Sequence, residues 1–407
     1  MKCGLLGRKL GHSFSPQIHA QLGDYPYELF EKEPEELEDF LKNGDFTGIN
    51  VTIPYKQQVI PYLDELSPTA QKLGAVNTIV RRDGRLIGHN TDYFGFRRMV
   101  RSSGLEISGK KVLVLGSGGA SKPVIAALQE LGGNVIVISR SGENNYDNLH
   151  LHADAAVIVN TTPVGMYPHT GVSPVDLSIF SRLEGVLDVI FNPARTQLLL
   201  EAEKRGLTTV NGLLMLVAQA KEASEWFTGN TIDDAVIDRI HGSLRRQTEN
   251  IILIGMPGCG KSTVGKLLAE QLGKEFVDAD DTIVELAGKS IPAIFAEDGE
   301  AVFRDWETKA LTALGKRSGL VIATGGGCVT KERNYPLLHQ NGTIFWLKRD
   351  LEKLPTDGRP LSQANRLTDM YNQRKPLYTA FADHVIDNGG DMDQTLVQIL
   401  NALEEAK

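Results

Sequence analysis

The segment Gly255–Thr263, GMPGCGKST, constrains the fold most, because it matches the phosphate-binding pattern G-x-x-x-x-G-K-[ST]. That pattern joins a buried strand to a helix, and both flanks agree with it. Asn250–Ile254 (NIILI) is typical of a short buried strand, and Val264 and Leu268 fall on one helical face. A strand–loop–helix unit of this kind belongs to an α/β domain with a parallel sheet.

The chemistry of such a loop explains its residue types. Glycines let the backbone N–H groups wrap around phosphate oxygens, and the dipole of the following helix favours negative charge. Lys261 would meet the β- and γ-phosphates, and Ser262 would ligate Mg²⁺. The loop alone indicates only an NTPase or a kinase. The predicted ATP-binding residues are Gly258, Cys259, Gly260, Lys261, Ser262 and Thr263.

Further charged motifs follow the loop. FVDADD places Asp278 and Asp280 at the end of the next predicted strand, on the same side of it. Such paired carboxylates can hold Mg²⁺ through water and orient an acceptor hydroxyl, so we predict a metal site at Ser262 and Asp278; a solvated acidic loop is the alternative. Next come FRDWE, TGGG, GRPL and QRKPLY, which contain Arg304, Gly325–Gly327, Arg359 and Arg374.

From about Asn250 onward this combination resembles shikimate kinase, a small P-loop kinase of the nucleoside-monophosphate-kinase type. The resemblance implies that Arg304 and Arg374 clamp the shikimate carboxylate and that Arg359 reaches the transferring phosphoryl group from a lid. Leu354-Pro355 stands where the family commonly has an Arg over the adenine, and the lid segment is short. The implied shikimate-binding residues are Asp280, Arg304, Gly325, Gly326, Gly327 and Arg374, and the implied catalytic residues are Lys261, Asp280 and Arg359.

A second glycine-rich turn, LGSGGAS at Leu115–Ser121, directly follows the predicted strand KKVLVL. Such a turn holds the pyrophosphate of a dinucleotide in Rossmann folds, although here Ser121 replaces the third glycine, and a plain tight turn is the alternative. Arg140 ends the next predicted strand, where Arg accommodates the NADP phosphate. We therefore predict NADP rather than NAD. The predicted cofactor residues are Gly116, Gly118, Gly119, Ala120, Ser139 and Arg140.

Upstream of this turn lie HSFSP, NVTIPYK, GAVNT and HNTD, and downstream lie NTTPVGM, FNPARTQLL and NGLLMLVAQA. Together with the turn, these motifs resemble shikimate dehydrogenase over about Met1 to Ser243. Ser13 and Ser15 match the positions that hold the substrate carboxylate. Thr52, Asn77 and Gln219 match those that bind ring hydroxyls, and Lys56 and Asp92 match the catalytic pair. Phe191 sits where a Tyr is commoner, and Asn144 where a second phosphate-binding Arg often lies.

The predicted fold class is α/β, with a shikimate-dehydrogenase-like substrate domain, a Rossmann NADP domain and a P-loop kinase domain with a parallel sheet. We assign 1–248 to the dehydrogenase, with a substrate part at about 1–104 and 213–248 and an NADP part at about 105–212. Residues 249–407 form the kinase. A helix is expected from Ile232 to about Leu244, and the polar stretch Arg245–Asn250 is expected to break it at the boundary.

Composition narrows the partners. The net charge of −8 argues against nonspecific binding to nucleic acid or anionic membranes, and no apolar stretch is long enough to span a bilayer. Three scattered Cys give no disulfide framework, so we predict a cytoplasmic location. The resemblances together imply a bifunctional enzyme of aromatic amino-acid biosynthesis that uses NADP(H), ATP and Mg²⁺. Three alternatives stay open: one half, the kinase before the dehydrogenase, is a ligand-binding or regulatory module without chemistry; the dehydrogenase accepts quinate; or the kinase acts on another small polyol or a nucleotide.

Overall fold

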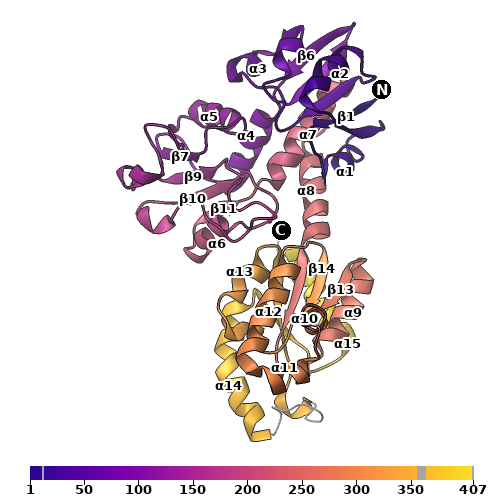
Figure 1. Ribbon diagram of the computed structural model, residues 1–407, viewed down its shortest axis with the longest axis vertical. Helices are drawn as coiled ribbons and strands as arrows, with labels where there is room; N and C mark the ends of the chain where they lie inside the picture. The colour runs from indigo at the N-terminus through magenta and orange to yellow at the C-terminus, as the bar shows by residue number, and fades with distance from the viewer. Residues whose placement is uncertain (12, 355–363, 406–407) are drawn as a thin grey trace. The chain divides into compact units, whose positions relative to one another are not determined.

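A computed structural model describes residues 1–11, 13–354 and 364–405 of the chain. It divides into two compact units by its internal contacts. Unit 1 comprises Met1–Met166 and Val172–Ser243, and unit 2 comprises Tyr167–Gly171 and Leu244–Lys407. Both units are layered from helices and mainly parallel sheets (Figure 1), so the predicted α/β fold class is confirmed.

The first sheet of unit 1 is mixed and has the strand order β2-β1-β3-β5-β6-β4. β1 pairs in parallel with β2 and β3, whereas β5 is antiparallel to both β3 and β6. Asp83 and Gly84 form the hairpin turn between β5 and β6, with φ of 51° and 77°. The strands are β1 Cys3–Gly7, β2 Tyr27–Glu31, β3 Gly48–Val51, β4 Glu65–Leu66, β5 Thr78–Arg82 and β6 Arg85–His89.

The second sheet of unit 1 is entirely parallel, in the order β11-β10-β9-β7-β8. Its middle strands are buried runs of Val, Leu and Ile, as a sheet covered on both faces requires. The edge strand β11 is short, with three residues that are all partly buried. The strands are β7 Lys111–Leu115, β8 Asn134–Ile138, β9 Val157–Asn160, β10 Gly185–Asp188 and β11 Thr208–Val210.

Helices connect and cover these strands, and α4 packs along α7. In chain order, the α-helices described here are α1 Ser15–His19, α2 Leu37–Asn43, α3 Pro68–Leu73, α4 Asp92–Ser103, α5 Ser121–Glu130, α6 Gln197–Lys204, α7 Leu213–Thr228 and α8 Ala235–Thr248. The predicted break after Leu244 is wrong, because α8 continues through Arg245 and Arg246 to Thr248. Arg and Gln are good helix formers, and no Gly or Pro interrupts the stretch.

Unit 2 has one parallel sheet in the order β13-β14-β12-β15-β16, with helices on both faces (Figure 1). The central strand β12 is buried along its whole length. Across the part of the chain that the structure describes, no helix has the length and hydropathy needed to cross a membrane. The strands are β12 Asn250–Ile254, β13 Glu275–Asp278, β14 Leu320–Ala323, β15 Gly342–Lys348 and β16 His384–Asp387. The helices are α9 Lys261–Leu272, α10 Ala279–Ala287, α11 Ile291–Glu297, α12 Gly299–Gly315, α13 Asn334–His339, α14 Ala364–Phe381 and α15 Met392–Glu405.

Candidate active sites

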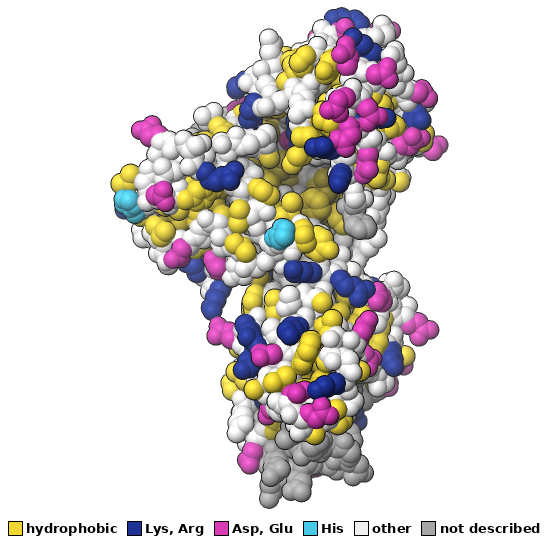
Figure 2. Space-filling model, in the orientation of Figure 1, with side chains coloured by type: hydrophobic (Ala, Val, Ile, Leu, Met, Phe, Trp, Pro, Cys, Tyr) yellow, Lys and Arg dark blue, Asp and Glu magenta, His cyan; other side chains and the backbone are white. Residues whose placement is uncertain are grey.

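Unit 1 contains a cavity of about 360 Å³, which is lined by residues of β1 and β3 and by the segments that follow β10 and β11. On the face shown in Figure 2, hydrophobic side chains gather in a hollow between the two lobes of this unit. β1 and β3 run in parallel, so the segments that follow them reach the cavity from the same sheet edge. The structure brings together every predicted substrate and catalytic residue of this half: Ser13, Ser15, Thr52, Lys56, Asn77, Asp92 and Gln219.

The charged centre of this cavity is the pair Lys56 and Asp92. Lys56 Nζ donates to Asp92 Oδ2 at 2.6 Å, and the side chains are 19% and 11% exposed. Asp92 is the first residue of α4, where the helix dipole favours a carboxylate. The ammonium group is therefore oriented by a carboxylate whose own position is stabilised by the helix.

Neutral polar groups form the wall beside this pair. Asn77 Nδ2 donates to Thr91 Oγ1 at 3.0 Å and lies 3.5 Å from Gln219 Oε1, while Thr91 N donates to Asn77 Oδ1 at 2.7 Å. These side chains are buried, so their polar atoms must be paired or meet a polar ligand. The network fixes the positions of the amide groups of Asn77 and Gln219 at the cavity.

Two lining residues, Asn50 and Lys9, were missed at the sequence level. Asn50 Oδ1 accepts from the Tyr27 hydroxyl at 2.7 Å, and Asn50 Nδ2 donates to Thr78 Oγ1 at 3.2 Å. Asn50 opens the motif NVTIPYK, which was the available signal. Lys9 has no distinguishing sequence context and resembles any surface lysine.

The predicted cofactor turn lies between β7 and α5. Gly116 has φ of 101°, and a Cβ there would lie 2.9 Å from Thr162 Cγ2, so a side chain is excluded. A Cβ at Gly118 or Gly119 would meet no described atom within 4 Å, which leaves room for a ligand at the helix N-terminus. Ser121 Oγ donates to Gly118 O at 2.7 Å and so closes the turn that lacks its third glycine.

The remaining predicted cofactor residues differ in their distance from the cavity. Ala120 lines it, whereas Ser139 and Arg140 follow β8 and are not among its lining residues. Arg140 is exposed, as an arginine that meets a ribose phosphate needs to be. Ser139 N donates to Asn144 O at 3.1 Å, which shapes the loop after β8.

A buried carboxylate supports the cavity from behind. Asp188 ends β10 and is fully buried; Asn160 Nδ2 (3.1 Å) and Ile190 N (3.0 Å) donate to its Oδ1, and Thr196 Oγ1 donates to its Oδ2 (2.7 Å). Burial raises the pKa of Asp188 from 3.8 to about 7, although the hydrogen bonds oppose this. The segment that it anchors carries Phe191, which lines the cavity.

Unit 2 contains a larger cavity of about 880 Å³ around the phosphate loop. Cys259 does not line it: its side chain is fully buried, with Sγ 3.0 Å from the Cβ position of Gly255. Arg359 lies outside the described residues. The other predicted residues of this half all line the cavity: Gly258, Gly260, Lys261, Ser262, Thr263, Asp278, Asp280, Arg304, Gly325, Gly326, Gly327 and Arg374.

The loop side of this cavity carries the ammonium group of Lys261 and the side-chain oxygens of Ser262 and Asp278. Lys261 Nζ donates to the carbonyls of Gly255 (3.0 Å) and Met256 (3.1 Å). Ser262 Oγ donates to Asp278 Oδ2 at 2.7 Å. A hydroxyl and a carboxylate that converge in this way fit Mg²⁺, which takes few protein ligands beside substrate phosphates.

The predicted placement of Asp280 on a strand is wrong. β13 ends at Asp278, and Asp280 stands in the first turn of α10. The reason is capping, because Asp278 Oδ1 accepts from Asp280 N at 3.1 Å and starts the helix. Burial and the neighbouring charge of Asp278 raise the pKa of Asp280, while Lys261 and Arg304 oppose this.

Arginines and glycines form the opposite wall. Arg304 is buried and donates to Glu307 Oε2 at 2.9 Å and to Glu300 Oε1 at 3.1 Å. A Cβ at Gly327 would lie 2.2 Å from Arg304 Nη1, so only glycine leaves room for the guanidinium. Arg374 Nη1 donates to Gly326 O at 3.1 Å. Both arginines therefore flank the Gly325–Gly327 segment.

Glu307 is a site residue that the sequence reading missed, although it closes the motif FRDWE. It is almost fully buried, and burial raises its pKa while Arg304 opposes this. Its Oε1 and Asp280 Oδ1 have no hydrogen-bond partner among the described residues, and they lie 2.8 and 3.1 Å from the Cβ position of Gly325. Two unsatisfied carboxylate oxygens thus face one glycine in the cavity.

Comparison with known proteins agrees with this geometry. A family model described as the shikimate dehydrogenase substrate binding domain matches residues 5–79. The shikimate dehydrogenase (NADP(+)) of Clostridium perfringens strain SM101 is 36% identical over 264 residues, which cover 60% of this chain and 97% of that protein. The chain belongs to the shikimate dehydrogenase family. NADP-dependent dehydrogenase activity therefore falls to the N-terminal part of the chain.

Several solved structures of dehydrogenases are similar to the same part of the chain. Shikimate dehydrogenase 1 from Peptoclostridium difficile is 38% identical, with a TM-score of 0.56, and the match covers 60% of this chain and 98% of that one. A chorismate mutase/shikimate 5-dehydrogenase fusion from Clostridium acetobutylicum is 38% identical, with a TM-score of 0.57, over 60% and 96% of the two chains. A quinate dehydrogenase from Corynebacterium glutamicum in complex with NAD is 30% identical, with a TM-score of 0.54, over 60% and 98%.

The C-terminal part matches a second family. A shikimate kinase family model matches residues 257–404, which begin inside the phosphate loop. The predicted fusion of a shikimate dehydrogenase with a shikimate kinase is therefore confirmed, as are the two enzyme classes and the use of NADP and ATP.

Proposed function

We propose that residues 1–248 reduce 3-dehydroshikimate to shikimate with NADPH, and that residues 249–407 phosphorylate shikimate to shikimate 3-phosphate with MgATP. The observation that carries the first reaction is the Lys56–Asp92 pair in a cavity that adjoins the cofactor turn. The second reaction is supported by the cavity that joins the phosphate loop to Arg304 and Arg374.

In the dehydrogenase, ketone reduction needs a hydride at carbon and a proton at oxygen. NADPH supplies the hydride when bound. Lys56 gives the proton to the developing alkoxide, and Asp92 orients the ammonium and stabilises it before transfer. Ser13 and Ser15 hold the substrate carboxylate, while Thr52, Asn77 and Gln219 form hydrogen bonds with the ring hydroxyls, as donors and as acceptors. The open turn leaves room for NADP, and the residues that would bind it are Gly116, Gly118, Gly119, Ala120, Ser139 and Arg140.

In the kinase, binding of ATP exchanges the bonds of Lys261 to Gly255 and Met256 for bonds to the β- and γ-phosphates. Mg²⁺ neutralises phosphate charge when bound, and Ser262 and Asp278 hold it. Asp280 hydrogen-bonds the accepting hydroxyl; burial and the neighbouring charge of Asp278 raise its pKa, which makes its carboxylate a stronger base than an exposed aspartate.

Arg304 and Arg374 fix the shikimate carboxylate on the far wall of this cavity, with the backbone of Gly325–Gly327 between them. A buried guanidinium pairs with a carboxylate in a defined orientation, so the two arginines also set which hydroxyl faces the nucleotide. Arg359 is assigned from its motif to the lid that reaches the transferring phosphoryl group.

The deciding experiment assays the purified chain in separate reactions: shikimate with ATP, and shikimate or quinate with NADP or NAD. Formation of ADP with shikimate, together with shikimate-dependent reduction of NADP, supports both proposed reactions. Absence of ADP formation would make the kinase half a ligand-binding module, and faster turnover of quinate with NAD would overturn the assigned dehydrogenase substrate and cofactor.

A further inference from the structure

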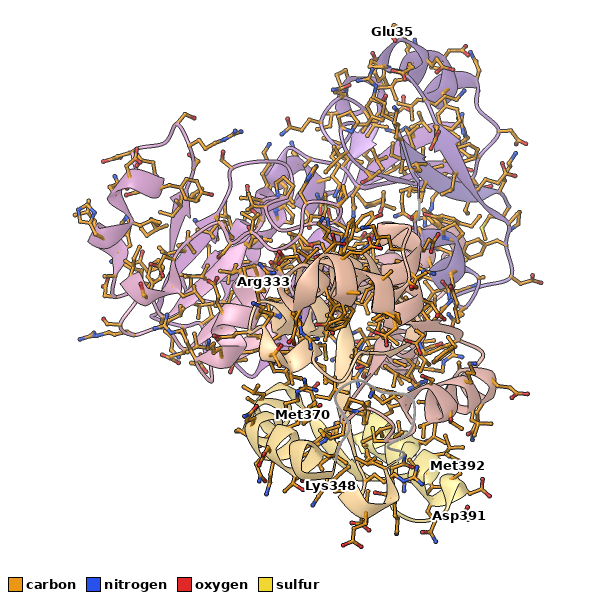
Figure 3. The ribbon with its side chains drawn as sticks, turned by 60° about the horizontal axis from the view of Figure 1, so that its bottom comes forward. Glu35, Arg333, Lys348, Met370, Asp391 and Met392 are labelled. Atoms are coloured by element: carbon orange, nitrogen blue, oxygen red, sulfur yellow. The ribbon has the colours of Figure 1, made fainter. Side chains whose placement is uncertain are left out.

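The sheet of unit 2 places a further arginine beside the phosphate loop. In the order β14-β12-β15-β16, the parallel strands end at one edge, where the phosphate loop follows β12 and Arg349 follows β15. Asn388 follows β16 at the same edge. Figure 3 labels Lys348, the last residue of β15, and Asp391, which lies three residues after Asn388; both are at the same end of unit 2.

Arg349 reaches the loop itself. Its Nη1 lies 4.0 Å from the Cβ position of Gly260, the residue before Lys261. Asn388 Nδ2 lies 2.9 Å from the same position and donates to Cys259 O at 2.6 Å, so Asn388 supports the loop backbone. Arg349 has no such role: its buried Nε has no hydrogen-bond partner among the residues that the structure describes.

The positive charge of Arg349 is also available. The adjacent carboxylate of Asp350 pairs with Lys353 Nζ at 3.3 Å, and Lys353 Nζ also donates to Gly389 O at 3.0 Å. Within the described part of unit 2, no ion pair is formed by Arg349. A guanidinium carries five donors, and a partly buried one without partners is costly unless a ligand supplies acceptors.

The strand order also determines which ligand this is. The predicted acceptor residues follow the strands on one side of β12: Asp278 ends β13, and Gly325–Gly327 follow β14. Arg349 and Asn388 follow the strands on the other side. A nucleotide whose terminal phosphate points at the acceptor extends toward β15 and β16, so its inner phosphates pass Arg349.

We propose that Arg349 binds the phosphate chain of ATP from the side of the loop opposite the acceptor. This assignment rests on the proposed kinase function. Arg349 would supply a cation beside the nucleotide in a kinase part that has Leu354-Pro355 where the family commonly has an arginine.

The test measures ADP binding to the full chain by calorimetry and the Michaelis constant for ATP. Arg349→Ala is expected to weaken ADP binding by about tenfold or more, since a charge-assisted contact to phosphate is lost. Arg349→Lys keeps the charge and is expected to lose less. Lys348→Ala, which removes the neighbouring exposed cation, is the matched control and is expected to bind ADP as the unaltered chain does.

Four outcomes would overturn the assignment. Unchanged ADP affinity in Arg349→Ala or a rise in the Michaelis constant for shikimate alone would show that Arg349 does not contact the nucleotide. An equal loss of ADP affinity in Lys348→Ala would indicate a general electrostatic effect of positive charge, and a loss in Arg349→Lys as large as in Arg349→Ala would indicate stacking on the base. If Arg349→Ala does not fold, Arg349→Gln replaces it with the same criteria. ADP binding without phosphorylation of shikimate would reject the proposed kinase reaction and leave Arg349 to be judged by ADP affinity.

Discussion

Replacement of Asp188 by Asn should make the free energy of unfolding of unit 1 depend less on pH. Asp188 is fully buried, and burial raises its pKa from 3.8 to about 7. In Asp188→Asn, the amide oxygen can still accept from Asn160 Nδ2 and Ile190 N, and the Thr196 hydroxyl can turn to accept from the amide. The variant therefore keeps the hydrogen-bonded shape and loses only the ionisation.

The magnitude follows from linkage between protonation and folding. A carboxyl whose folded pKa is raised favours the folded state fully below its unfolded pKa, and this advantage is lost as pH rises through the folded pKa. For Asp188 the window runs from 3.8 to about 7. At about 1.4 kcal/mol for each pH unit, the free energy of unfolding falls by about 4 kcal/mol across this window. Asp188→Asn should remove that part of the fall.

Scanning calorimetry of the full chain from pH 4 to pH 8 tests this, with added NADP to identify the transition of unit 1, because a ligand stabilises the unit that binds it. Asp176→Asn is the control: the backbone N–H of Ser178 lowers the pKa of the exposed Asp176, so its contribution has the opposite sign and is lost as pH falls. Parallel pH profiles for Asp188→Asn and the unaltered chain would refute the reasoning.

Other variants separate the two reactions. Lys56→Ala should lower dehydrogenase turnover by roughly a hundredfold or more because the proton donor is lost, with phosphorylation unchanged; unaltered turnover in an NADPH assay would remove Lys56 from the mechanism. Arg304→Ala or Arg374→Ala should raise the kinase KM for shikimate by about thirtyfold or more, which corresponds to about 2 kcal/mol, and a change in the ATP constant alone would contradict the assigned role. Arg333→Ala, which breaks only the exposed pair with Asp305 (Figure 3 labels Arg333), is the control and should leave both constants unchanged. Ser262→Ala should raise the Mg²⁺ concentration needed for half-maximal phosphorylation, and an unchanged Mg²⁺ dependence would exclude Ser262 as a ligand.

The glycine-rich loops could be predicted because their chemistry is local. Gly116 and Gly260 both have positive φ, at 101° and 98°, and only glycine adopts such values without strain. A loop that requires this conformation between a buried strand and a helix is therefore visible in sequence. The substrate residues of unit 1 became visible only through their motifs, since Ser13 and Gln219 are far apart in the chain.

The features that escaped prediction depend on tertiary context. Asp280 follows a strand in sequence, but the capping of α10 by Asp278 decides that it is helical. Glu307 is an acidic residue on a helix, and only its burial against Arg304 distinguishes it from an exposed glutamate. The polar stretch after Leu244 has good helix propensity, so polarity alone was an unreliable signal of a break.

The two cavities also differ in how many existing hydrogen bonds of their charged and polar side chains a bound substrate must replace. In unit 1 the Lys56–Asp92 pair already has the arrangement that the proposed proton transfer would need, so substrate binding would add contacts to it. In unit 2 the reactive groups are paired with the protein: Lys261 with loop carbonyls, Ser262 with Asp278 and Arg304 with Glu307. Binding of nucleotide and shikimate must therefore replace existing bonds as well as form new ones, and the free energy spent on that exchange lowers affinity.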